Sequence, residues 1–103
     1  MPYNYYVVSD ESENFYFNTA FGYIKYKNNG ELDYEVKVNG NNTINASNLV
    51  YVNNKIIFLS KKFPGTIYMY NSVTGNLINT YSIFLESEKS DNINALTSIV
   101  KLI

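Results

Sequence analysis

Cysteine, histidine, tryptophan and arginine are all absent from this chain of 103 residues. Without cysteine or histidine, the chain has no thiol nucleophile, no imidazole base and no conventional ligand set for zinc or haem. Any catalysis would depend on carboxylate, tyrosine, lysine or serine groups, so we expect no enzyme activity, no cofactor and no metal site. A chain without cysteine is compatible with oxidising and reducing compartments alike, so the sequence assigns no localisation.

An excess of positive charge is also missing. Eight lysines stand against nine acidic residues, and the formal net charge is −1. Binding to a phosphate backbone needs a cationic surplus, and arginine is the commonest reader of DNA bases. No apolar run approaches the roughly 20 residues of a membrane-spanning helix. We therefore expect neither nucleic acid nor membrane as a partner.

Alanine is scarce, with three residues, whereas asparagine and tyrosine are abundant, with 17 and 11. Alanine is the best helix former, while tyrosine, valine, isoleucine and phenylalanine favour strands and asparagine favours turns. The composition therefore predicts an all-β fold. A chain of this length buries about 60–70% of its surface on folding, which predicts one domain over residues 1–103.

Short apolar segments separated by polar turns recur along the chain. In residues 32–38 apolar and charged residues alternate, so we expect one packed face and one solvated face near a sheet edge. Residues 55–60 are apolar on both faces, as in an interior strand. The last segment is expected as a strand, with a helix as the alternative because its apolar residues recur near helical spacing. The expected strands lie at 5–8, 15–17, 23–27, 32–38, 44–46 with 49–52, 55–60, 66–70, 76–84 and 93–103.

The two halves of the chain resemble each other. Residues 22–24 correspond to 65–67 at an offset of 43, and residues 30–32 correspond to 75–77 at an offset of 45. This repeat predicts two four-stranded antiparallel units, at about 5–40 and 44–85, followed by the final strand at 93–103. Units of about 40–50 residues with four short strands are typical of propeller blades.

The stretch from Leu49 to Tyr81 resembles one blade of a β-propeller, in particular the quinoprotein-like and YVTN repeats. Their third and fourth strands are joined by a turn ending in Thr-Gly, as Thr74 and Gly75 are placed here. The first half resembles a more diverged blade, and residues 93–96 resemble the inner strand that begins a blade in WD-repeat proteins. The Gly-His and Trp-Asp pairs of those repeats are absent, and no cofactor ligand carries over.

Two blades do not close a ring, because each blade buries its faces against its neighbours. Three alternatives remain open. Several copies, such as three with six blades in all, assemble into a ring. The two units instead form a closed β-sandwich or barrel. In the third alternative, a strand is donated to a partner protein.

Tyrosine is the best indication of a binding surface, because it offers a large rigid contact area with a polar tip. We expect most tyrosines to pack in the core and a subset to form an exposed face for a protein or a glycan. Two acidic loops, at 10–13 and 86–91, have the carboxylates of a calcium site, but solvated turn charge is the favoured interpretation. The candidate binding residues are Tyr3, Tyr5, Tyr6, Tyr23, Tyr26 and the turn residue Phe63.

These features favour a non-catalytic protein-interaction or assembly module, acting on a protein partner or as a homo-oligomer. One alternative is a carbohydrate-binding lectin formed by ring assembly of two-blade chains. The other is a small viral or mobile-element protein that inhibits a host factor, which the size and the asparagine- and lysine-rich composition suggest.

Overall fold

A computed structural model describes residues 5–83, and this range contains eight β-strands and no helix. The strands form two antiparallel sheets, β1-β2-β3-β4 and β5-β6-β7-β8, in which chain neighbours pair. The prediction of an all-β fold with two four-stranded units is thus confirmed for residues 5–83. The strands are β1 (Val7–Ser9), β2 (Phe15–Asn18), β3 (Gly22–Tyr26), β4 (Leu32–Lys37), β5 (Ala46–Val52), β6 (Lys55–Ser60), β7 (Thr66–Asn71) and β8 (Leu77–Ser82).

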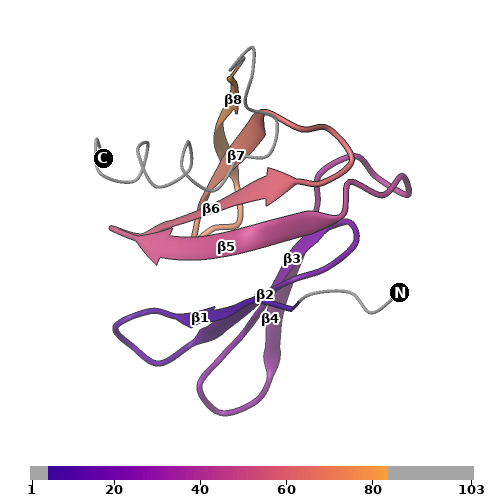
Figure 1. Cartoon of the computed structure of the whole chain (residues 1–103). Helices are drawn as coiled ribbons and strands as arrows, with labels where there is room; N and C mark the ends of the chain where they lie inside the picture. Colours follow the sequence, from indigo (N-terminus) through magenta and orange to yellow (C-terminus); the bar gives the residue numbers. More distant parts are fainter. Residues whose placement is uncertain (1–4, 84–103) are drawn as a thin grey trace.

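The second sheet (β5–β8) lies over one face of the first (β1–β4), as Figure 1 shows. We call the two faces in contact the inner faces and the opposite ones the outer faces. Because no strand pairs across the two sheets, they are not closed into a barrel, so the barrel form of the sandwich-or-barrel alternative is wrong for the described residues. The core between the inner faces consists of Tyr16, Tyr23, Val36, Ile44, Ala46, Leu49, Ile56, Phe58, Tyr68 and Tyr70.

Aromatic rings dominate this core. The ring of Tyr23 in β3 meets Phe58 and Tyr70 of the second sheet edge-on, at centroid distances of 5.7 and 5.8 Å. Phe58 in turn stacks on Tyr68 and Tyr70, at 5.4 and 5.7 Å. Edge-to-face and offset-stacked contacts suit the ring quadrupole and add to the burial of apolar area. The contact between the sheets is therefore specific in geometry as well as apolar.

The strand boundaries agree closely with the expected ones. The first strand begins two residues later than predicted, at Val7, and the segments 44–46 and 49–52 belong to one strand, β5, with a register shift between Ser47 and Val50. β6 has both faces buried between β5 and β7, as an interior strand should. The strand expected at 93–103 lies outside the described residues.

A β-bulge in β4 overturns one expectation from the alternating pattern. Tyr34 pairs with Lys25, but the next pair is Tyr26 with Leu32, so Asp33 is the extra residue. A bulge re-aims the side chains beside it. Leu32, expected on the packed face, therefore shares the outer face with Tyr26 and is 57% exposed, whereas Asp33 lies 3.3 Å from the Lys25 ammonium.

The second sheet has the same irregularity at the corresponding place. There Met69 pairs with Asn79 and Tyr70 with Leu77, which makes Ile78 the extra residue. Ile78 lies 45 positions after Asp33, the offset of the sequence repeat in this region. The preceding turns correspond as well, because Gly30 and Gly75 both have positive φ, 91° and 77°, and their N–H groups donate to the last residues before the turns.

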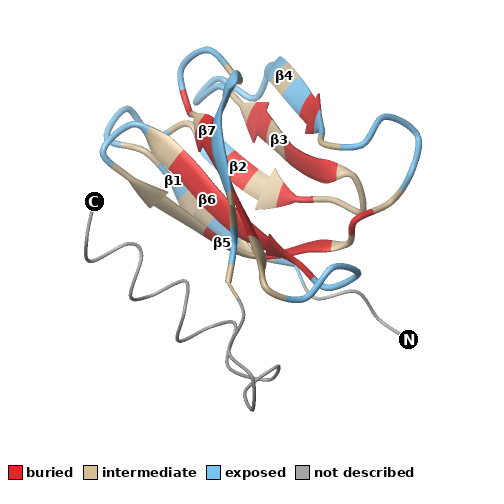
Figure 2. Cartoon of the chain, turned by 90° about the horizontal axis from the view of Figure 1, so that it is seen from above, coloured by how far each residue is buried: buried red, intermediate tan, exposed pale blue. Residues whose placement is uncertain are grey.

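The outer face of the second sheet is buried. Ile57, Leu59, Ile67 and Met69 form a second apolar cluster there, with exposed fractions between 0% and 3%. Figure 2 shows the resulting buried residues along β6 and β7 in red. The second sheet is therefore apolar and buried on both faces of its central strands.

The first prediction concerns the core between the sheets. Replacing Phe58 by Ala removes a fully buried ring that stacks on two others, so we expect the free energy of unfolding to fall by about 3–5 kcal/mol. The matched control is Phe63→Ala, because Phe63 is 42% exposed in a turn, and this change should cost about 1 kcal/mol or less. Urea denaturation followed by tyrosine fluorescence measures both; equal losses would contradict the assignment of the core.

Candidate functional site

The outer face of the first sheet carries a continuous set of apolar side chains that solvent reaches. Val7, Phe15 and Leu32 are 64%, 45% and 57% exposed, and three partly buried neighbours lie between them. Exposed apolar groups that are contiguous, rather than scattered, mark interaction surfaces. We call this set the first outer face; it consists of Val7, Phe15, Phe17, Ile24, Tyr26 and Leu32.

The alternation along the strands places these residues on one side. In β2, Tyr16 points into the core while Phe15 and Phe17 point outward. Cross-strand pairs share a face, and the register pairs Phe17 with Val7 and with Ile24. The face is therefore a product of the strand pattern together with the bulge that turns Leu32 outward.

The first outer face is built like the inner face of the second sheet. Its rings Phe17 and Tyr26 stack at 5.6 Å with an interplanar angle of 11°. In the second sheet, Phe58 and Tyr70 occupy the corresponding strands and stack at 5.7 Å with 18°. The second pair is buried against the first sheet, whereas the first pair has no such sheet over it among residues 5–83. The first outer face thus has the ring geometry of a surface that packs against another sheet.

An open groove continues this surface at its edge. It has a volume of about 530 Å³ and runs between β1 and β5, the edge strands of the two sheets. Its lining shares Val7 and Phe15 with the first outer face; the lining residues are Val7, Val8, Ser9, Phe15, Val50 and Tyr51. A partner seated on the face can therefore extend into the groove.

The six residues proposed from the sequence fall in different places. Tyr26 lies on the first outer face, and Tyr5, 73% exposed, stands two residues before Val7 of that face. Tyr6 is partly buried against the core, and Tyr23 is fully buried in it, so it is not available to a partner in this structure. Phe63, 42% exposed, is in the turn between β6 and β7, away from this surface. Tyr3 lies outside the described residues.

Sequence reasoning missed the phenylalanines of the face. The signal that would have found them is the alternation Phe15-Tyr16-Phe17, which puts two rings on the side opposite the tyrosine. Leu32 was beyond this reasoning, because an alternating pattern contains no sign of a bulge.

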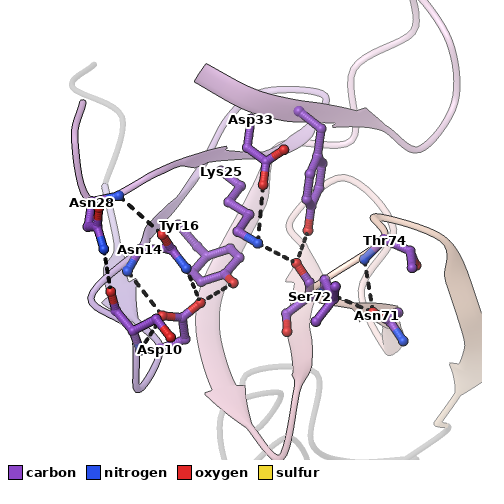
Figure 3. A network of polar contacts seen from close by, with 12 residues as sticks. Asp10, Asn14, Tyr16, Lys25, Asn28, Asp33, Asn71, Ser72 and Thr74 are labelled. Atoms are coloured by element: carbon purple, nitrogen blue, oxygen red, sulfur yellow. Dashed lines mark hydrogen bonds and ion pairs between the residues drawn. The ribbon is translucent and has the colours of Figure 1, made fainter. Parts of the chain in front are cut away.

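A polar network crosses the interface beside the aromatic core (Figure 3). The buried ammonium of Lys25 in the first sheet donates to the carbonyl oxygen of Ser72 in the second, at 3.1 Å, and pairs with Asp33 at 3.3 Å. It also lies 5.5 and 5.7 Å from the ring centroids of Tyr16 and Tyr34, within cation–π range. The charge is thus satisfied from several sides, as a buried charge must be.

Two tyrosine hydroxyls also take part in the polar network between the sheets. Tyr34 donates to the Ser72 carbonyl at 2.8 Å, so the hydrogen bond of 2.7 Å between Tyr23 and Tyr34 is donated by Tyr23. Burial raises the pKa of Tyr34 to about 12, and burial likewise raises the pKa of Tyr23. Both hydroxyls therefore remain protonated donors at neutral pH, which suits a structural role.

The acidic loop after β1 organises its own turn. The Asp10 carboxylate accepts from the hydroxyl of Tyr16 at 2.7 Å and from the side-chain amide and N–H of Asn14 at 2.9 and 3.0 Å. Glu11 accepts from Tyr51 of the second sheet at 2.9 Å. In the described range no three acidic side chains are grouped to hold a metal ion. The second acidic loop, at 86–91, lies outside that range.

Acid should weaken the Asp10 turn. Burial alone raises the pKa of Asp10, but the hydrogen bonds from Tyr16, Asn14 and Ser12 outweigh it and hold this pKa below the usual 3.8. Its contribution to stability is therefore fully present above the unfolded-state pKa and is lost as the pH falls through the lower folded-state pKa. We expect Asp10→Asn to be less stable than the parent at pH 6, by a difference that shrinks below pH 3.8.

Urea denaturation between pH 6 and pH 2.5 measures this difference. The control is Glu13→Gln, since Glu13 is exposed in the same turn. A constant difference between Asp10→Asn and the parent over this pH range would show that the Asp10 charge does not stabilise the turn.

The Lys25 network makes a separate prediction. Lys25→Met keeps the aliphatic stem but removes the ammonium, which leaves Asp33 without its ion pair and removes a donor to Ser72. We expect the free energy of unfolding to fall by about 1–3 kcal/mol. Lys61→Met, at an exposed turn, should stay within about 0.5 kcal/mol of the parent. Thermal and urea unfolding measure both variants, and a Lys25→Met protein as stable as the parent would refute the role of the ammonium.

Residues 5–83 include no helix of the length and apolarity needed to cross a membrane. The chain matches no protein-family model, no curated protein and no solved structure. Among the surfaces of residues 5–83, the first outer face is the strongest candidate for a functional site.

Proposed function

We propose that this chain is a non-catalytic assembly module, and that a second copy of the chain covers the first outer face. The observation that carries the proposal is the exposure of Val7, Phe15 and Leu32 on one face of a regular sheet. The stacked Phe17–Tyr26 pair beside them has the geometry of the pair that packs between the two sheets. Covering such a face removes apolar area from water, which drives association.

The proposed contact is a twofold one, in which the face packs on its own copy. The outer face of the second sheet is already buried, so it cannot pack against the first outer face of another copy in a ring-shaped assembly. Twofold dimers are the commonest closed assemblies, and they bring the same patch of both chains together. Glu35 and Lys37 are exposed on the outward side of β4, so a twofold axis near them lets each glutamate meet the other copy's lysine. The blade-like resemblance then applies to the stacking of sheets rather than to a closed propeller.

Light scattering over a dilution series tests the proposal. We expect a mass near twice the 11.8 kDa of the chain at high concentration, falling towards the monomer on dilution. Leu32→Lys should weaken the dimer by about tenfold or more, because it places a charge in an apolar contact. The matched control is Leu77→Lys, since Leu77 is 55% exposed against 57% for Leu32 but lies on β8 of the other sheet.

Three outcomes would contradict the proposal. A monomer at every concentration rules out self-assembly through this face. A trimer favours ring assembly, and glycan binding by that trimer would favour the lectin alternative. An equal effect of Leu32→Lys and Leu77→Lys would place the contact elsewhere. Unfolding curves of both variants separate a lost contact from a lost fold.

A further inference from the structure

Asparagine followed by glycine occurs at two places in the chain, and both pairs are exposed. Asn29 and Gly30 lie in the turn between β3 and β4, whereas Asn39 and Gly40 lie in the connection between β4 and β5. Such a pair can react with itself, because glycine has no side chain to hinder attack by its backbone nitrogen on the asparagine side chain. The residue types and the exposure are the same, so the hydrogen bonds around each pair decide how readily it reacts.

The first pair is held by three hydrogen bonds. The Asn29 side-chain amide donates to the Glu31 carboxylate at 2.6 Å, and the Asn29 side-chain oxygen accepts from the Glu31 N–H at 3.0 Å. The Gly30 N–H donates to the carbonyl oxygen of Lys27 at 2.9 Å. The attacking nitrogen and the amide that would leave are thus both engaged, and a reaction at Asn29 must first break these contacts.

The second pair has none of these restraints. In the described part of the chain, neither the Asn39 side chain nor the Gly40 N–H takes part in a hydrogen bond. Only the main-chain carbonyl of Asn39 accepts, from the Asn42 N–H at 3.0 Å. The Asn39 side chain can therefore turn towards the Gly40 nitrogen without losing a contact.

We propose that Asn39 is a site of spontaneous deamidation through a succinimide, and that Asn29 is protected from the same reaction. The Gly40 nitrogen loses its proton to solvent base and bonds to Cγ of Asn39, and the side-chain nitrogen leaves as ammonia. Water then cleaves one of the two imide C–N bonds. Cleavage at Cγ gives aspartate, whereas cleavage at the main-chain carbonyl gives isoaspartate. Water is the only co-reactant, and no atom is oxidised or reduced.

The modified residue lies in the connection that joins the two sheets. The Val38 N–H donates to the carbonyl of Phe21, and the Ile44 N–H donates to that of Ala20, each at 2.8 Å. The connection is therefore anchored to the turn between β2 and β3 on both sides of Asn39. Isoaspartate adds a methylene to the main chain between these anchors, and either product adds a negative charge. The proposal does not rest on the dimer, because the reaction needs a single chain.

Peptide mapping by mass spectrometry measures both sites in one sample of the full-length protein, and chromatography separates isoaspartate from aspartate. During incubation at mildly alkaline pH, we expect Asn39 to react at least about tenfold faster than Asn29, because only Asn29 must first release its hydrogen bonds. Asn39→Gln should abolish the fast reaction, since the longer side chain cannot close the same small ring. An Asn39 rate no higher than the Asn29 rate would overturn the proposal.

Two variants of Glu31 test the protection of Asn29, with the Asn39 rate in each sample as the reference. Glu31→Ala removes the acceptor of the Asn29 amide, so Asn29 should react about fivefold faster or more. The matched control, Glu31→Gln, keeps an acceptor oxygen and should stay within about twofold of the parent. An unchanged Asn29 rate in a folded Glu31→Ala protein would contradict the proposed protection.

Unfolding in urea separates the effect of the structure from that of the local sequence. Without the native hydrogen bonds, the rates at Asn29 and Asn39 in the parent should converge. A difference that persists in urea would show that neighbouring residues, not the folded turns, set the two rates, and it would overturn the proposal.

Discussion

The packing of Tyr23 against Phe58 and Tyr70 is the contact on which the rest of the structure depends. Each sheet is four short strands wide and has apolar side chains on both faces, so neither sheet is stable as a single layer. The ring contacts between the inner faces solve this for one face of each sheet. The Lys25 ammonium and the Tyr34 hydroxyl then fix the lateral position of the sheets, because both must reach the same Ser72 carbonyl.

The packing of the inner faces leaves two outer faces, and these differ in their exposure to solvent. The cluster around Ile57 on the second sheet is buried, whereas the first outer face is open around Val7 and Leu32. Because of this asymmetry, one outer face rather than two has exposed apolar side chains. A unit with two open faces would add further copies without limit, while a unit with one open face stops at a closed pair.

Much of the fold was predictable because strand and turn signals are local. Alternation, β-branched and aromatic runs and Asn-Gly turns located all eight described strands to within about two residues. The interior position of β6 followed from its two apolar faces. The bulges at Asp33 and Ile78 are related by the same offset of 45 residues, but the sequence did not predict them.

The candidate site was harder, because it depends on which side of each strand faces the other sheet. Tyr23 and Tyr26 look alike in sequence, yet one is in the core and the other on the outer face. The bulge exchanged the expected places of Leu32 and Asp33, and the partner of Lys25 is 47 residues away. Such pairings arise only when the two sheets dock, so no local pattern contains them.

The two sheets are also separate in the order of the chain, and this has a consequence for how the protein folds. Every strand pairs only with its neighbour in sequence, so all six strand pairs of residues 5–83 are hairpins with short connections. Short loops cost little closure entropy, and hairpins form on the microsecond scale. The pairing of distant parts of the chain is thus reduced largely to the packing of one four-stranded sheet on the other, and such local strand pairing favours fast folding.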